Sequence, residues 1–178
     1  MSAGFARPAT HADIPAIITC SIAAWSQRLA DPSLLPPPDL LQAGWQQYFN
    51  APPAPGRYAL VATSNNEAVG WLMSDLGADP DIAHINAVEI LDITIHPDHR
   101  RHGHGSRLLH ALADSARTQG MQALQMWFLA DDPAMAAFLA GQGFAADGAR
   151  RELADVYDAG DAATHEVRVL ADITNEGS

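Results

Sequence analysis

The sequence contains no lysine, and all ten of its basic residues are arginines. It therefore has neither the lysine of a P-loop nucleotide site nor a lysine that could form a Schiff base. Its one cysteine, Cys20, cannot form an internal disulfide or anchor a thiolate metal site, which argues against redox chemistry. No apolar run approaches the roughly 18 residues of a membrane span, and the first residues lack the pattern of a signal peptide. We therefore expect a cytoplasmic protein.

The composition is typical of a soluble globular protein. Of the 178 residues, 48% are hydrophobic and 17% are charged. We found no internal repeats, low-complexity tails or linker, and this length is usual for a single domain. We therefore expect residues 1–178 to form one domain.

Acidic residues dominate the charge. The formal net charge is −11, and a strongly acidic surface repels nucleic acid phosphates, so we expect no nucleic acid partner. The segment 92–120 is the exception, because it carries four arginines against three acids. An anionic ligand is therefore expected to bind there.

Hydrophobic periodicity and turn residues predict alternating strands and helices. Strands are predicted at residues 5–8, 58–63, 68–74, 85–95, 123–129, from 144 onward, and at 164–170, with helices at 14–31, 39–49, 106–118 and 133–141. The predicted order is βααβββαβαββ, which indicates an α/β (α+β) fold.

A candidate anion site follows the predicted strand 85–95, where a glycine-bearing turn leads into a helix. The first N–H groups of a helix lack partners within it and bind anions well. Gly103 and Gly105 permit close approach of a phosphate, and Arg100 and Arg101 supply positive charge. A dinucleotide fingerprint is excluded, because Leu108 stands where its third glycine should be. The alternative is an ordinary strand-to-helix turn with solvated arginines.

The R-x-x-G-x-G pattern formed by Arg100, Gly103 and Gly105 resembles the GNAT acetyltransferase superfamily, and the order of elements resembles it over essentially the whole chain. The resemblance implies a mixed, mostly antiparallel sheet, acetyl-CoA as the acyl donor, and a monomer or homodimer. It also implies that main-chain atoms of Ile93 and Ile95 pair with the pantetheine arm. The residues implied to hold the diphosphate are Arg101, His102, Gly103, His104, Gly105 and Ser106.

A second motif supports the resemblance, since family members often carry N-x-x-A-x-x-F-Y-x-x-x-G-F at this place. Phe138, Gly143 and Phe144 match it, and Asp132 replaces the asparagine that often contacts the cofactor. Leu139 replaces the tyrosine that commonly protonates the leaving thiolate. Either another group supplies that proton, or the chain is a non-catalytic acyl-CoA-binding module.

Glu89 is the candidate general base. It precedes Arg100 by eleven residues, which is the spacing of the catalytic glutamate in histone-type members of the family. An ammonium group must lose a proton before it attacks a thioester, and a partly buried carboxylate can accept that proton, while a main-chain N–H near Ile93 polarises the carbonyl. The alternative is that Glu89 simply faces solvent. Asp92 is a second candidate, but a regular strand would place it on the opposite face from Glu89.

Several histidines lie in and around the proposed anion loop. They are His96, His99, His102, His104 and His110. The pattern lacks a pair fixed on a helix or strand, such as H-E-x-x-H, so we expect no metal site, although a histidine metal loop remains the alternative. Imidazoles beside phosphates, or solvated loop residues, fit the pattern better. The sequence thus predicts an N-acetyltransferase acting on an amine of a small molecule or peptide, favouring a cationic one, with no membrane partner.

Overall fold

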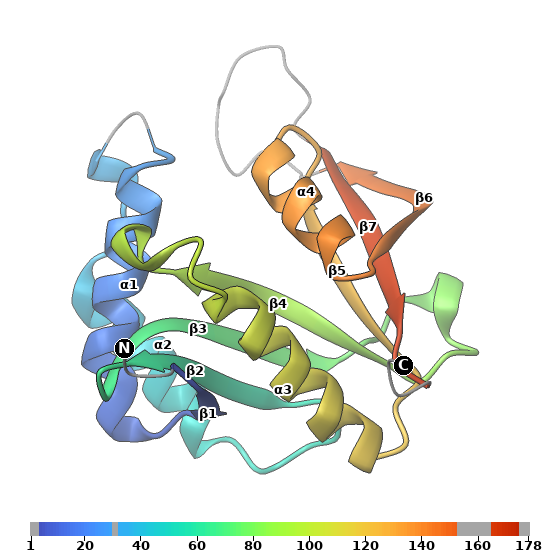
Figure 1. Cartoon of the computed structure of the whole chain (residues 1–178), viewed down its shortest axis with the longest axis horizontal. Helices are drawn as coiled ribbons and strands as arrows, with labels where there is room; N and C mark the ends of the chain where they lie inside the picture. The colour runs from blue at the N-terminus through green and yellow to red at the C-terminus, as the bar shows by residue number, and fades with distance from the viewer. Residues whose placement is uncertain (1–3, 30–31, 153–164, 175–178) are drawn as a thin grey trace.

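A computed structural model describes residues 4–29, 32–152 and 165–174, and Figure 1 shows their arrangement. The elements are β1 (Ala6–Pro8), α1 (Ile14–Ser26), α2 (Pro38–Asn50), β2 (Tyr58–Ser64), β3 (Glu67–Leu76), β4 (Ala87–Ile95), α3 (His104–Thr118), β5 (Ala123–Leu129), α4 (Pro133–Gly141), β6 (Ala145–Glu152) and β7 (His165–Asp172). Short 3-10 helices separate some of them. The predicted order βααβββαβαββ is confirmed. The loop predicted between the last two strands, residues 154–163, lies outside the described residues.

The seven strands form one sheet in the order β1-β2-β3-β4-β5-β7-β6. The β4–β5 pair is parallel, and every other neighbouring pair is antiparallel. A parallel pair needs a long crossover, and α3 provides it between β4 and β5. The expected mixed, mostly antiparallel sheet is therefore confirmed. Within the described residues, no helix is long and apolar enough to span a membrane.

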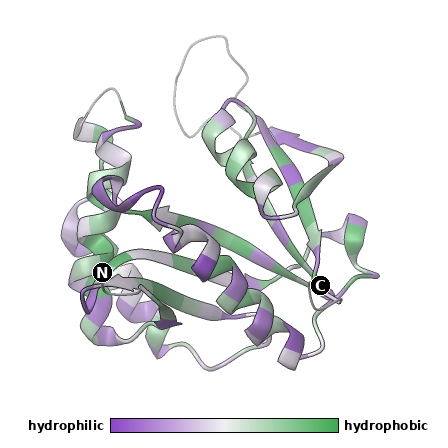
Figure 2. Ribbon diagram, viewed as in Figure 1, coloured by the Kyte–Doolittle hydropathy of each residue, from purple (hydrophilic) through white to green (hydrophobic). Residues whose placement is uncertain are grey.

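Helices cover both faces of the sheet, and alternate side chains of each strand enter different cores. Leu60 and Leu72 join the larger core beneath α3, whereas Val61 and Trp71 join a smaller core beneath α1 and α2. Figure 2 shows hydrophobic residues concentrated along the central strands and on the helices that cover them. We refer to these two sides as the α3 face and the α1 face.

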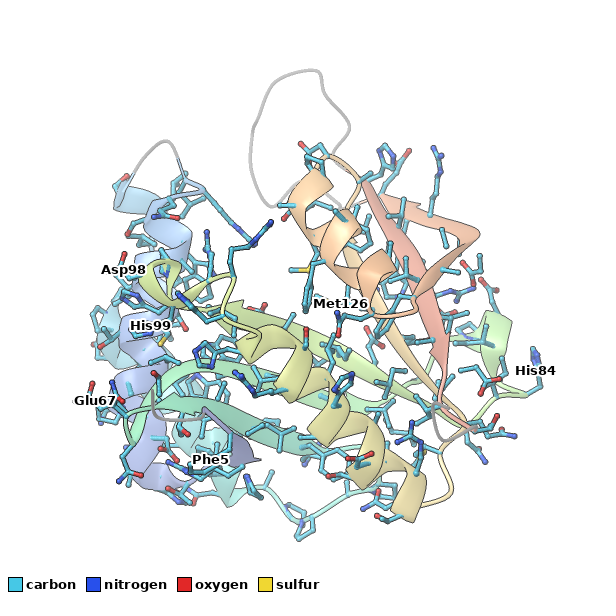
Figure 3. The ribbon with its side chains drawn as sticks, viewed as in Figure 1. Phe5, Glu67, His84, Asp98, His99 and Met126 are labelled. Carbon is cyan, nitrogen blue, oxygen red and sulfur yellow. The ribbon has the colours of Figure 1, made fainter. Side chains whose placement is uncertain are left out.

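The parallel strands β4 and β5 pair along only part of their length. Cα partners run from Ala87–Ala123 to Ile90–Met126, and the remainder of β4 has no partner on that side. Figure 1 shows the two strands diverging beyond this point, and Figure 3 labels Met126 where pairing ends. The divergence leaves backbone groups of β4 free to pair with a ligand.

Strand β4 contains a bulge, which changes the direction of its side chains. Ser74 of β3 lies opposite Ile90, but Met73 lies opposite Asp92, so Leu91 is an extra residue. Both Ile90 and Ile93 consequently enter the core on the α3 face. The expectation from a regular strand is therefore wrong: Glu89 and Asp92 both lie on the α1 face.

Candidate active site

The turn before α3 has the backbone conformation that its glycine pattern indicates. Gly103 is the N-cap residue of α3 with φ +77°, in the left-handed region that glycine adopts without strain. Arg107 closes the turn by donating a hydrogen bond to the carbonyl oxygen of His102 at 3.0 Å. The helix begins at His104, two residues before the predicted start. The main-chain N–H groups of its first turn thus point out of the helix beside the glycine turn.

A cleft of about 640 Å³ lies between this turn, the free part of β4, the end of α1 and the inner side of α4. The sequence-predicted residues that line it are Ile93, Ile95, Arg100, Arg101, Gly103, His104, Gly105 and Ser106. Sequence reasoning missed the contributions of Ala24 on α1, of Arg28 in the turn after it and of Met135 on α4. The cleft therefore contains most of the predicted cofactor residues, all within residues 93–106, and the structure adds residues from distant parts of the chain to them.

Backbone alternation determines which main-chain groups of β4 face the cleft. The His96 N–H donates to the Val69 carbonyl oxygen of β3 at 2.8 Å. Because successive residues of a strand direct their N–H and C=O groups to alternate sides, those of Ile93 and Ile95 point away from β3. They face the side on which β5 has separated.

Asp132 occupies the N-cap of α4 and does not line the cleft. Its side chain accepts a hydrogen bond from the Met135 N–H at 2.9 Å. Its other oxygen lies 3.5 Å from the guanidinium of Arg28. The chain turns sharply after α1 because the N–H groups of Arg28 and Leu29 both bond to the Trp25 carbonyl oxygen, so α1 ends earlier than predicted. The Arg28–Asp132 ion pair thereby joins the ends of α1 and α4.

Positive groups surround the start of α3. His104 is 5% exposed, and its Nδ1 lies 3.5 Å from the Arg107 guanidinium. Burial lowers the pKa of His104, and the charges of Arg107, His99 and His102 lower it further. Figure 3 labels His99, on the short helix that precedes the glycine turn. These groups favour an anion at this end of the cleft.

Two carboxyl groups occupy the α1 face near the point where β4 and β5 separate. Glu89 is partly buried, and its Oε2 accepts a hydrogen bond from Gln125 Nε2 at 3.0 Å. Gln125 is fully buried and pairs with Glu89 across the parallel strands. Sequence reasoning missed it, although a glutamine within the apolar strand 123–129 was a usable signal. The partial burial and this hydrogen bond do not fit a glutamate that simply faces solvent.

Asp92 is also partly buried, and its carboxyl has different surroundings. Burial raises the pKa of Asp92, while the Ile93 N–H, the positive charge of Arg28 and the Thr94 hydroxyl favour its ionised form. One strand thus carries two carboxyl groups on the same face, in different environments.

The histidines of the loop are spread out. Ring centroids are 5.7 Å apart for His96 and His99 and 6.3 Å apart for His99 and His104. In the part of the chain that the structure describes, no three His, Cys, Asp or Glu side chains are grouped to hold a metal ion. Burial raises the pKa of the Cys20 thiol to about 11, so this thiol is a poor nucleophile at neutral pH.

Comparison with known proteins gives a family match over most of the chain. The model of the Acetyltransferase (GNAT) family matches residues 22–144. Mycothiol acetyltransferase of Stackebrandtia nassauensis is 34% identical over 79 residues, covering 44% of this chain and 24% of that protein. The match thus spans about a quarter of the length of that relative.

Solved structures with similar folds cover nearly the whole chain. The ribosomal-protein-S18-alanine N-acetyltransferase of Escherichia coli aligns with a TM-score of 0.67 and 18% identity, over 99% of this chain and 97% of that one. The Salmonella typhimurium protein yncA, solved with its cofactor acetyl-CoA, aligns with a TM-score of 0.69 and 19% identity, over 99% and 98% of the two chains. At these identities the likeness establishes the fold.

Proposed function

We propose that this chain, which belongs to the GNAT acetyltransferase family, transfers the acetyl group of acetyl-CoA directly to a primary amine. GNAT acetyltransferases use acetyl-CoA, and yncA was solved with it. One observation carries the proposal. The cleft has a helix start suited to an anion at one end and the unpaired part of β4 along it, and two carboxyl groups of β4 lie beside the point where the strands separate.

The residues of the cleft suit the parts of acetyl-CoA. Main-chain groups of residues 101–106 would hold the diphosphate at the start of α3, where the helix dipole and Arg101 add positive charge. The outward main-chain groups of Ile93 and Ile95 would pair with the amides of the pantetheine arm, as a further strand would. Gly105 is packed closely against α4, since an added Cβ would lie 2.9 Å from the Phe138 ring, so a larger residue would not fit at this position.

Residues of β4 would carry out the transfer. Glu89 would accept a proton from the ammonium group, because only the neutral amine attacks a carbonyl. The Ile93 N–H would donate a hydrogen bond to the thioester oxygen and stabilise the negative charge that develops there. Holding both reactants in one cleft would supply much of the remaining rate enhancement.

The acceptor we propose is a cationic amine of a small molecule or peptide. The α1 face carries three carboxyl groups, those of Glu89, Asp92 and Asp75. Of these, the Asp75 carboxyl forms a close ion pair, 2.8 Å from the guanidinium of Arg57. The excess of carboxyl groups on this face favours a positively charged acceptor.

An amine panel tests the activity. Purified protein is mixed with acetyl-CoA and each of a set of polyamines, aminoglycosides and peptides with free amines, and release of free thiol is recorded. We expect thiol release with at least one amine and none without an amine. Saturable binding of acetyl-CoA without thiol release across the panel would instead support the non-catalytic acyl-CoA-binding module.

Substitution of Gly103 by aspartate is expected to weaken acetyl-CoA binding at least tenfold, which corresponds to about 1.4 kcal/mol. The variant places a negative charge beside the proposed diphosphate position, where an added Cβ lies 3.7 Å from the Arg107 guanidinium. Calorimetry measures the affinity. The matched control is Gly120→Asp, because Gly120 has φ +75° with nothing close to an added Cβ. Equal affinity of the two folded variants would remove the turn from the cofactor site.

Binding of acetyl-CoA is expected to take up protons as the pH falls below neutrality. The lowered pKa of His104 leaves it largely neutral at pH 7, and a diphosphate beside it favours its protonated form. Affinity should therefore rise as the pH falls from 8 to 6. Calorimetry in buffers of different ionisation enthalpy measures the uptake, which should decrease in His104→Gln. Heats independent of the buffer would contradict this prediction.

A further inference from the structure

We infer that Asp92 donates the proton that the departing sulfur of coenzyme A requires, so that two carboxyl groups of β4 divide the acid and base roles. The inference rests on the proposed function, because it needs a thioester in the cleft and Glu89 as the base. The position from which a family tyrosine commonly supplies this proton holds Leu139, which is fully buried in the core on the α3 face. The leaving sulfur therefore needs a different donor in this chain.

Asp92 lies beside the proposed reaction centre. It immediately precedes Ile93, whose N–H faces the open side of β4 and would hold the reacting carbonyl. The bulge at Leu91 turns the Asp92 side chain to the α1 face, where Glu89 also lies. Without the bulge, the sheet would separate these two carboxyl groups.

The titratable groups that line the cleft are poorly suited to this role. Arginine does not release its proton in proteins. His99 and His104 lie at the other end of the cleft, beside the glycine turn. Of the two carboxyl groups of β4 beside the point of strand separation, Asp92 is therefore the one that best fits a proton donor to sulfur.

The surroundings of the two carboxyl groups differ in the direction that the two roles require. The Glu89 carboxyl accepts a hydrogen bond from Gln125, as a carboxyl group in the role of a base can. Asp92 lies beneath the end of α1, and burial raises its pKa. A pair of carboxyl groups in contrasting environments is how one site provides both an acid and a base near neutral pH.

Groups from several elements surround Asp92 and bear on its ionisation. From the turn after α1, Arg28 favours the ionised form, but its guanidinium also pairs with Asp132 at 3.5 Å, and its side chain is 54% exposed. From β3, the residue opposite Asp92 is Met73, which has no charge. From β4 itself, the Ile93 N–H and the Thr94 hydroxyl favour the ionised form, and Glu89 lies on the same face. From β5, the residue beside Glu89 is the neutral Gln125.

The proposed step balances in protons and electrons. Glu89 removes one proton from the ammonium nitrogen, and the free amine forms the C–N bond at the carbonyl carbon. When the C–S bond breaks, its electron pair goes to sulfur, which takes the proton of Asp92. A second proton leaves the amine nitrogen and restores Asp92 through water, while Glu89 releases the first proton to solvent. The products are an amide, the free thiol of coenzyme A and one proton.

The protonation state of Asp92 can be measured without any acceptor amine. Infrared difference spectra between the wild-type protein and Asp92→Asn at pH 7 should contain the band of one protonated carboxyl group. Asp114→Asn is the control, because Asp114 is 76% exposed in its side chain and pairs with Arg117 at 2.7 Å, and it should show an ionised carboxylate. An ionised Asp92 at pH 7 would overturn the inference and leave the proposed function standing.

The kinetic test assigns one limb of the pH profile to each carboxyl group. With an amine that is acetylated, Asp92→Asn should lose about 10- to 100-fold in kcat. Its kcat/KM profile should also lose the basic limb, and its Kd for acetyl-CoA should be unchanged. A basic limb that persists in Asp92→Asn would contradict the assignment.

A second variant keeps the test open if Asp92→Asn does not fold. Arg28→Gln removes a surface charge that favours ionised Asp92, so the basic limb should move to higher pH. Thr19→Gln, on α1 and away from the cleft, controls for a general effect of altering this part of the chain. No shift of the limb in Arg28→Gln would also count against Asp92.

Discussion

Replacing Glu89 by glutamine is expected to lower kcat by about 10²- to 10⁴-fold, the range typical of lost acid–base catalysis. Glutamine keeps the size of the side chain and can still pair with Gln125, which is 3.0 Å away in the wild-type protein, but it cannot accept the proton of an ammonium group. The Kd for acetyl-CoA should be unchanged, and the acidic limb of the kcat/KM profile should disappear. Steady-state kinetics with an acetylated amine, together with calorimetry, measure these effects.

A matched control is Glu67→Gln, at the exposed start of β3 and labelled in Figure 3, which should retain wild-type kinetics. If Glu89→Gln kept both the wild-type rate and the acidic limb, the base would lie elsewhere. Asp92, or water acting on an already neutral amine, would then be the next candidates.

Truncation of Leu139 to alanine is expected to lower the free energy of unfolding by roughly 2 to 5 kcal/mol. The side chain has no exposed area and packs in the core on the α3 face, so its loss leaves a cavity that neighbouring side chains fill incompletely. Leu139 does not line the cleft, and acetyl-CoA affinity in the folded variant should change little. Urea denaturation measures the free energy.

The control for this prediction is Leu40→Ala on α2, where the leucine is 63% exposed and its truncation should change the free energy of unfolding by less than about 0.5 kcal/mol. Equal stability of the two variants would show that Leu139 does not support the core. A large loss of acetyl-CoA affinity in folded Leu139→Ala would instead place this residue in the cofactor site.

The sequence predicted the elements whose signals are local. The turn residues at 64–67 separate two apolar runs, and β2 and β3 form the predicted hairpin. The glycine at 103 predicted the turn before α3, and it has the positive φ that favours glycine. A strand, a helix and a second strand in succession are typical of a parallel pair, and β4 and β5 form one.

The arrangement of the candidate site depends on features without such a signal. An extra residue at Leu91 reverses the faces of all later side chains in β4. The residue types from Ile90 to Ile93 are compatible with a strand that has the bulge and with one that lacks it. The separation of β4 from β5, and the ion pair between Arg28 and Asp132, arise from tertiary contacts between segments far apart in the chain. Periodicity reports the face of a regular strand and carries no information on where a strand departs from regularity.

The fate of a labelled acetyl group tests direct transfer most directly. The wild-type protein is incubated with acetyl-CoA that carries ¹³C in its acetyl group, together with an amine that releases thiol in the panel. Mass spectrometry should then find the label on the amine nitrogen, in an amount equal to the free coenzyme A, and none on the protein. Label attached to a side chain of the protein, or label that stays in acetyl-CoA bound to folded protein with every amine, would contradict direct transfer in this cleft.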